Sequence, residues 1–132
     1  MLMFKSTKSI VVLLGSILLL AACKPSDKYA GEWYVVSNDG EMLVDFSKEK
    51  VLTVEDEEGQ KETYDFNQHS TGFINEVSYY GIEMEGKDYY VVFDDKKDED
   101  NANLIVQTNH ASDFEDVVGD VVFEMNRNEY PK

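Results

Sequence analysis

From residue 31 to residue 127, apolar and polar residues alternate in short stretches, and this period of two constrains the fold more than any other feature. Successive side chains of a β-strand point to opposite faces, so the pattern predicts strands with one buried face. Turn-forming residues such as Asn38-Asp39-Gly40 and Glu58-Gly59 separate the stretches at hairpin spacing. We predict nine strands, at residues 32–37, 42–47, 50–55, 61–66, 72–78, 80–85, 88–94, 103–108 and 120–127.

Successive hairpins without a long crossover predict an up-and-down meander, and closing the meander removes the exposed strand edges that invite aggregation. The predicted fold is therefore all-β, a small antiparallel up-and-down β-barrel of eight or nine strands. Ser112 and Glu115 have capping-box spacing, and Gly119 follows, so residues 112–119 hold either a short helix or a loop across one barrel mouth. Parity along the strands assigns an inward-facing set: Trp33, Val35, Val44, Phe46, Leu52, Val54, Tyr64, Phe66, Ile82, Met84, Tyr89, Val91, Phe93, Leu104, Val106, Val121, Phe123 and Met125.

The N-terminus has the form of a secretion signal, because Lys5 and Lys8 precede an apolar run at residues 10–20. That run is too short for a permanent transmembrane helix, so we expect it to be cleaved. Leu20-Ala21-Ala22-Cys23 resembles the bacterial lipobox. The resemblance implies that Cys23 receives a diacylglyceryl group and becomes the first residue of the mature protein. The alternative is an ordinary signal peptide with a chance cysteine.

Three segments follow from this interpretation: a signal peptide at residues 1–22, a lipidated cysteine with a tether at residues 23–30, and a barrel domain at residues 31–132. The net charge of −15, from 27 acidic and 12 basic residues, argues against a nucleic-acid partner. It also leaves the acyl group on Cys23 as the expected membrane contact. We expect an extracytoplasmic, lipid-anchored protein, and the preference for lysine over arginine favours a Gram-positive cell surface.

Gly31-Glu32-Trp33 resembles the Gly-x-Trp opening of lipocalins and of bacterial lipocalin-like domains. In those families the tryptophan closes the barrel base, and a basic side chain from a late strand packs over its ring. The resemblance assigns these barrel-closing roles to Gly31, Trp33 and Arg127, and a cation–π contact between the last two is expected. The chain is shorter than a typical lipocalin and shows no match to the family's other loops.

The resemblance also implies a small apolar ligand inside the barrel. Its expected lining residues are Val44, Phe46, Tyr64, Phe66, Tyr89, Phe93 and Phe123. These side chains are bulky, so they could instead fill the interior. We therefore expect a binding or interaction module, and the alternative is a ligand-free structural or modulatory protein that contacts other envelope proteins or the cell wall.

Other chemistry finds little support in the sequence. The acidic runs at residues 55–58 and 94–101 lack the glycine and terminal glutamate of a calcium-binding EF-hand loop. His69 and His110 lie in turn-like segments without a nucleophile motif, so we expect no catalytic residue, metal or cofactor. Tyr79-Tyr80 and Tyr89-Tyr90 each place one ring outward, either as a partner-binding patch or as stabilising cross-strand pairs.

Overall fold

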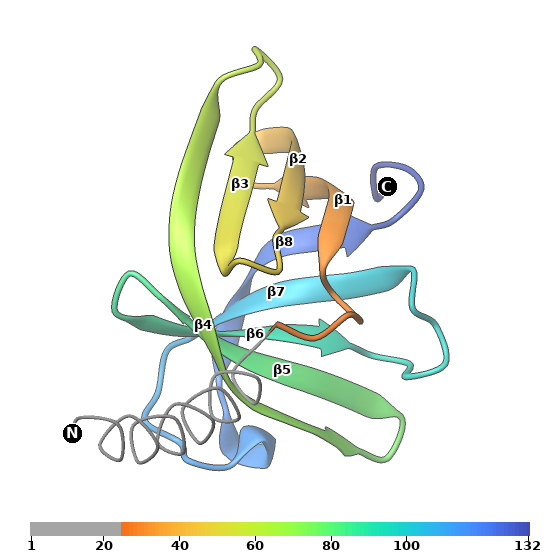
Figure 1. Ribbon diagram of the computed structural model, residues 1–132. Helices are drawn as coiled ribbons and strands as arrows, with labels where there is room; N and C mark the ends of the chain where they lie inside the picture. Colours follow the sequence, from red (N-terminus) through yellow and green to blue (C-terminus); the bar gives the residue numbers. More distant parts are fainter. Residues whose placement is uncertain (1–24) are drawn as a thin grey trace, which may run out of the picture.

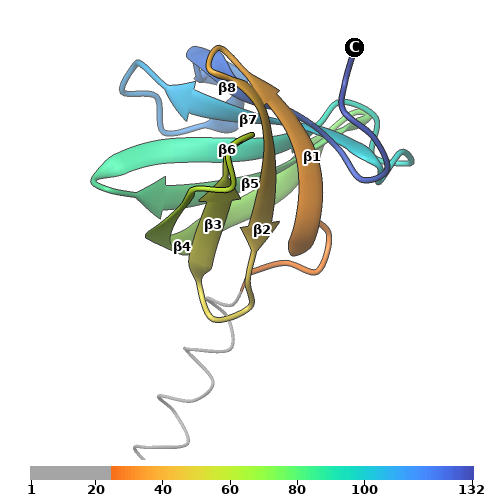
Figure 2. The ribbon, with the colours of Figure 1, turned by 90° about the horizontal axis from the view of Figure 1, so that it is seen from above.

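The computed structural model describes residues 25–132, which form a closed eight-stranded barrel (Figures 1 and 2). Each strand pairs antiparallel with the next, and the last strand pairs with the first. This confirms the predicted all-β antiparallel barrel, whereas the expected signal peptide and Cys23 lie outside the described residues. The elements are β1 (Gly31–Ser37), β2 (Gly40–Phe46), β3 (Val51–Glu55), β4 (Lys61–Ile74), β5 (Val77–Met84), β6 (Lys87–Phe93), β7 (Asn101–Gln107), a 3-10 turn η1 (Phe114–Asp116) and β8 (Gly119–Asn126).

The strand count is eight rather than nine, because residues 61–66 and the first three residues of the segment predicted at 72–78 belong to one long strand, β4, and the last two residues of that segment begin β5. Figure 1 shows β4 running past β3 at one end and along β5 at the other. A β-bulge lies between Gln68 and Ser70, where the pairing with β5 shifts by one residue. Beyond the bulge, the residues of β4 that face inward and outward are exchanged, so the regular alternation is interrupted. Because the stretch around the bulge is also polar, its sequence resembles a turn. The hairpin turn lies instead at Asn75, which has a positive φ of 56°.

A second bulge changes the inward face of β8. Leu104 pairs with Phe123, but Ile105 pairs with Val121, so Val122 is the extra residue. Val122 packs against the core, and Val121 is 51% exposed. The prediction that Val121 faces inward is therefore wrong, because alternation by two fails wherever a strand carries an extra residue.

The segment after β7 forms a single 3-10 turn, with Asp113 at its N-cap and no side-chain capping hydrogen bond. The predicted capping box is therefore absent. Phe114 of this turn stacks on Tyr79, with ring centroids 4.1 Å apart. Because Tyr79 neighbours the buried Tyr80 on β5, its ring lies on the outer face of the sheet. The segment therefore covers the outside of the barrel wall rather than a mouth.

Candidate ligand cavity in the barrel

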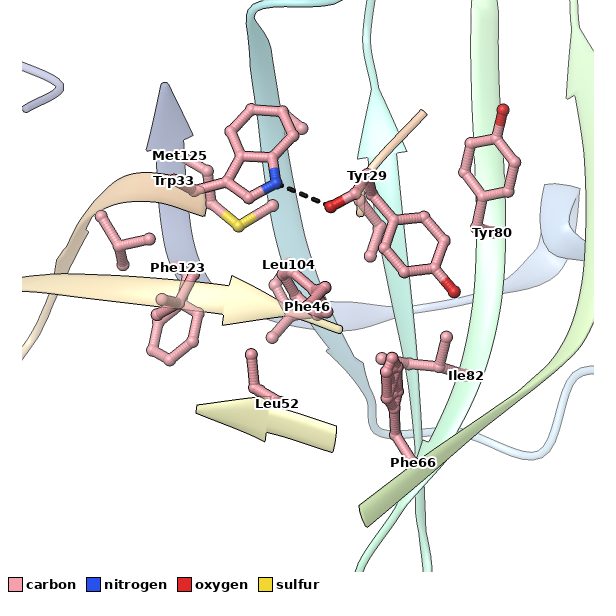
Figure 3. Packing of buried hydrophobic residues seen from close by; sticks show 14 of the residues in the cluster. Tyr29, Trp33, Phe46, Leu52, Phe66, Tyr80, Ile82, Leu104, Phe123 and Met125 are labelled. Atoms are coloured by element: carbon pink, nitrogen blue, oxygen red, sulfur yellow. Dashed lines mark hydrogen bonds between the residues drawn. The ribbon is translucent and has the colours of Figure 1, made fainter. Parts of the chain in front are cut away.

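One end of the barrel is filled by aromatic side chains. Tyr29, which precedes β1, is fully buried, and its ring centroid lies 5.3 Å from that of Phe46 and 5.4 Å from that of Tyr80. Figure 3 shows the Tyr29 ring between Phe46 and Phe66 on one side and Tyr80 on the other. The Trp33 indole donates a hydrogen bond of 2.8 Å to the Tyr29 carbonyl oxygen. This end of the barrel is closed by packing, with close edge-to-face ring contacts.

Hydrogen bonds hold this plug in place. The Tyr29 hydroxyl donates to Gln68 Oε1 at 2.9 Å, and the Ser26 backbone N–H donates to the same oxygen at 3.0 Å. Burial raises the pKa of the Tyr29 phenol well above its ordinary value. Pro25 is buried as well. Residues 25–30, which the sequence suggested as a tether, therefore pack onto the barrel, and any tether would have to precede residue 25.

Arg127 lies over the Trp33 ring, with its guanidinium carbon 3.8 Å from the ring centroid. Its two terminal nitrogens donate hydrogen bonds of 3.0 Å to the carbonyl oxygens of Glu32 and Lys28. Gly31 has a φ of +96°, and a Cβ there would lie 3.4 Å from Arg127 Nη1. The expected cation–π contact is present, and the left-handed backbone beside the guanidinium explains why glycine suits position 31.

The opposite end of the barrel holds a cavity of about 470 Å³. The cavity lies beside the turn after β1, the start of β2 and the start of β6, whereas Tyr29 packs just before the start of β1. The cavity and Tyr29 are therefore at opposite ends of the strands. The volume falls within the roughly 300–1,000 Å³ typical of small-molecule sites. The apolar and aromatic lining comes from seven strands: Met42, Leu52, Val54, Tyr64, Met84, Tyr89, Leu104, Val122 and Phe123, with the half-exposed Val121 at its edge.

The polar groups of the cavity are Ser37, Asn38 and four carboxylates: Asp39, Glu62, Glu85 and Asp120. The Tyr64 hydroxyl donates a 2.9 Å hydrogen bond to Glu62 Oε2, and this bond is the main reason why the pKa of Tyr64 is raised. The pKa of Tyr89 is also raised, first by burial and then by the charge of Glu85. Two tyrosine rings and two carboxylates therefore share one side of the mouth.

The expected ligand-lining residues divide between the two ends. Tyr64, Tyr89 and Phe123 line the cavity. Phe46, Phe66 and Phe93 belong to the aromatic packing that includes Tyr29 and Trp33. Val44 is 2% exposed in the same core and does not line the cavity.

Several lining residues escaped the sequence prediction. Met42 and Val122 lie in the cavity wall outside the parity set, whereas Leu52, Val54, Met84 and Leu104 belong to that set without having been chosen as ligand-lining. The signal that could have identified them is size, because they are the smaller or more flexible inward residues, and space remains where such side chains meet.

The outward tyrosines form a local cluster rather than a bare patch. Tyr79 and Tyr90 lie diagonally across the β5–β6 pair with ring centroids 6.0 Å apart, and Phe114 contacts both rings. Tyr90 is 6% exposed. This arrangement favours the stabilising interpretation of these rings over a partner-binding patch.

The two histidines lie in separate segments of the barrel. His69 lies at the β4 bulge, 3.3 Å from Asp88 Oδ1, and His110 is exposed in the segment after β7. Within residues 25–132, no group of three or more His, Cys, Asp or Glu side chains is arranged to hold a metal ion. In the same part of the chain, no helix has both the length and the apolar character needed to cross a bilayer.

Comparisons of the chain with protein-family models, with curated proteins and with solved structures gave no match.

Proposed function

We propose that this chain is a bacterial surface lipoprotein, anchored through an acylated Cys23, whose barrel binds a small apolar ligand without catalysing a reaction. The observation that supports binding most directly is the 470 Å³ cavity, because its wall is mainly apolar while its polar groups gather at the mouth. A preformed pocket of this kind is the usual form of a small-molecule site. The proposed location of the protein is the extracytoplasmic face of a cell membrane, with a Gram-positive host favoured.

The position of the N-terminal segment supports this arrangement. Residues 25–30 enter the barrel at the end closed by Tyr29, and the cavity opens at the other end. An acyl anchor on Cys23 would stand two residues before the packed Pro25. The closed end would then face the membrane, and the mouth would point away from it, where a ligand has free access.

Binding is tested with N-phenyl-1-naphthylamine, an apolar dye whose fluorescence rises when it leaves water. Val54 lies in the cavity wall, so Val54→Trp should fill space that the dye occupies and weaken binding about tenfold or more. Leu43, on the outer face of β2 and 39% exposed, provides the matched control Leu43→Trp. Both variants carry the same N-terminus, so dye taken up by detergent or lipid cancels between them. Equal dye binding by the two variants would contradict the proposal.

The anchor is tested by mass spectrometry of the N-terminal peptide of the protein isolated from a bacterial membrane. The expected peptide begins at Cys23 and carries acyl chains. Cys23→Ser should abolish the acylation and release the protein from the membrane fraction. An unmodified N-terminus at Cys23, or cleavage at another residue, would contradict the lipoprotein assignment.

The second candidate function is a ligand-free structural or modulatory protein of the envelope that contacts other proteins or the cell wall. The filled half of the barrel favours it, because Tyr29, Trp33, Phe46, Phe66 and Phe93 leave no room for a ligand at that end. This candidate predicts that blocking the cavity with Val54→Trp changes no activity of the protein in its host.

A further inference from the structure

The charge of the cavity mouth has a single sign. The lining includes four carboxylates, and none of the described residues that line it is a lysine, arginine or histidine. The carboxylates come from separate parts of the barrel: Asp39 from the turn after β1, Glu62 from β4, Glu85 from the turn after β5, and Asp120 from β8. A ligand that fills the cavity must therefore place its polar end in a negative field.

Two tyrosines sharpen this preference on one side of the mouth. Tyr64 and Tyr89 both line the cavity, and the charge of Glu85 contributes to the raised pKa of each phenol. Glu62 is held beside Tyr64 by their 2.9 Å hydrogen bond. A carboxylate and the face of an aromatic ring both attract a cation, so a site that contains both groups is well suited to an ammonium group.

Apart from the four carboxylates, the two tyrosines, and Ser37 and Asn38 at the end of β1, the cavity is lined by apolar side chains. Met42, Val54 and Val122 are partly buried apolar residues of this wall, so they give a ligand tail apolar surface to pack against. An uncharged polar group placed there would lose its hydrogen bonds with water. The site therefore fits an amphiphile whose apolar tail lies inside the cavity and whose charged head lies at the mouth.

We propose that the cavity selects amphiphiles with a cationic head group, such as a protonated alkyl amine, over neutral or anionic ones. The tail packs against Val54 and Val122, and the ammonium group lies near Glu62 and Glu85 with the rings of Tyr64 and Tyr89 beside it. A fatty-acid carboxylate of the same length is repelled by the four acidic side chains. The proposal rests on the proposed function and adds the chemical class of the ligand.

The methionines provide a direct test on the full chain. Met42 and Met84 line the cavity, whereas Met125 lies outside it and borders a separate acidic hollow with Asp94 and Asp98. With methyl-13C methionine, octylamine should shift the Met42 and Met84 signals and leave Met125 unchanged. Titrations with octylamine, octanol and octanoate compare a cationic, a neutral and an anionic head on one chain length.

We expect octylamine to bind about tenfold more tightly than octanol, and octanoate to bind more weakly than octanol. Glu62→Gln combined with Glu85→Gln should bring octylamine to within about twofold of octanol. The control pair, Glu49→Gln with Glu83→Gln, removes the same charge from exposed positions away from the cavity lining and should keep the tenfold preference.

Three results would overturn the proposal, and they separate it from the function on which it rests. Equal affinities for octylamine and octanol, with shifts at Met42 and Met84, would leave an apolar site without charge selection. No shift of these two methyl groups with any of the three probes would overturn the binding function as well. A shift of Met125 alone would place the amine outside the cavity.

Discussion

Arg127 offers the most direct test of how the closed end of the barrel is stabilised. The change is Arg127→Met, which keeps an apolar stem and removes the guanidinium. It eliminates two hydrogen bonds of 3.0 Å, to the carbonyl oxygens of Glu32 and Lys28, and the stacking over Trp33 at 3.8 Å. Hydrogen bonds from charged groups contribute roughly 1.5–3 kcal/mol when buried, and about 1 kcal/mol each is reasonable for this half-buried side chain. A cation–π contact adds about 0.5–2 kcal/mol.

The expected loss in the free energy of unfolding is therefore about 2–4 kcal/mol, a large part of the roughly 5–15 kcal/mol typical of a small domain. Urea titration followed by the fluorescence of Trp33, the only tryptophan, measures it directly. Arg127→Lys keeps the charge but not the planar fork, so it should recover less than half of the loss. The control Lys61→Met removes an exposed cation and should change stability by less than about 0.5 kcal/mol. A similarly small change for Arg127→Met would refute the conclusion that Arg127 stabilises the closed end of the barrel.

Three further predictions concern stability. The raised pKa of Tyr29 means that the folded chain holds the phenolic proton more tightly than the unfolded chain, so its contribution to stability is complete below about pH 10 and falls as the pH rises above it. Tyr29→Phe should flatten that fall in urea titrations across this pH range. The variant should also lose about 1 kcal/mol of stability at neutral pH, because it lacks the hydrogen bond to Gln68. Gly119→Ala would press a methyl group against the Val106 carbonyl oxygen and should destabilise the barrel by about 1–3 kcal/mol; an unchanged urea midpoint would show that the start of β8 moves freely. Phe114→Ala removes the ring stacked on Tyr79 and should lower the unfolding temperature through a loss of about 1–2 kcal/mol, and no change in calorimetry would mean that this covering contributes nothing.

Local sequence patterns were sufficient to predict the first two hairpins. The β1–β2 and β2–β3 hairpins have regular two-residue alternation and turn residues where the chain reverses, so both signals agree. The pattern failed at the bulges in β4 and β8, where one extra residue shifts the phase and local sequence carries no mark of it. As a result a strand was divided in two, and Val121 was placed on the wrong face.

Other features depend on contacts between residues far apart in the chain. Tyr29 precedes the first strand and belongs to no alternating stretch, and its partner Gln68 lies 39 residues away. Its role as a plug was therefore invisible from the local pattern. By contrast, the pairing of Trp33 with Arg127 was expected from a family resemblance, and the structure contains that contact.

The cavity was the least predictable feature, because its existence depends on how side-chain volume is distributed along the barrel axis. Parity gives the inward residues but not their depth. Phe46, Phe66 and Phe93 meet around Tyr29 and Trp33, whereas Val54 and Leu104 face the other end, where the space is left. The total volume of the inward side chains suggested a filled interior, yet the large rings are concentrated in one half.

The most direct test of ligand binding is native mass spectrometry of the protein purified gently from the envelope of its own host. We predict an added small-molecule mass that is released on denaturation, is lost from Val54→Trp and is kept by Leu43→Trp. A bare mass for the unaltered protein, or the same added mass on Val54→Trp, would contradict a ligand in the barrel cavity.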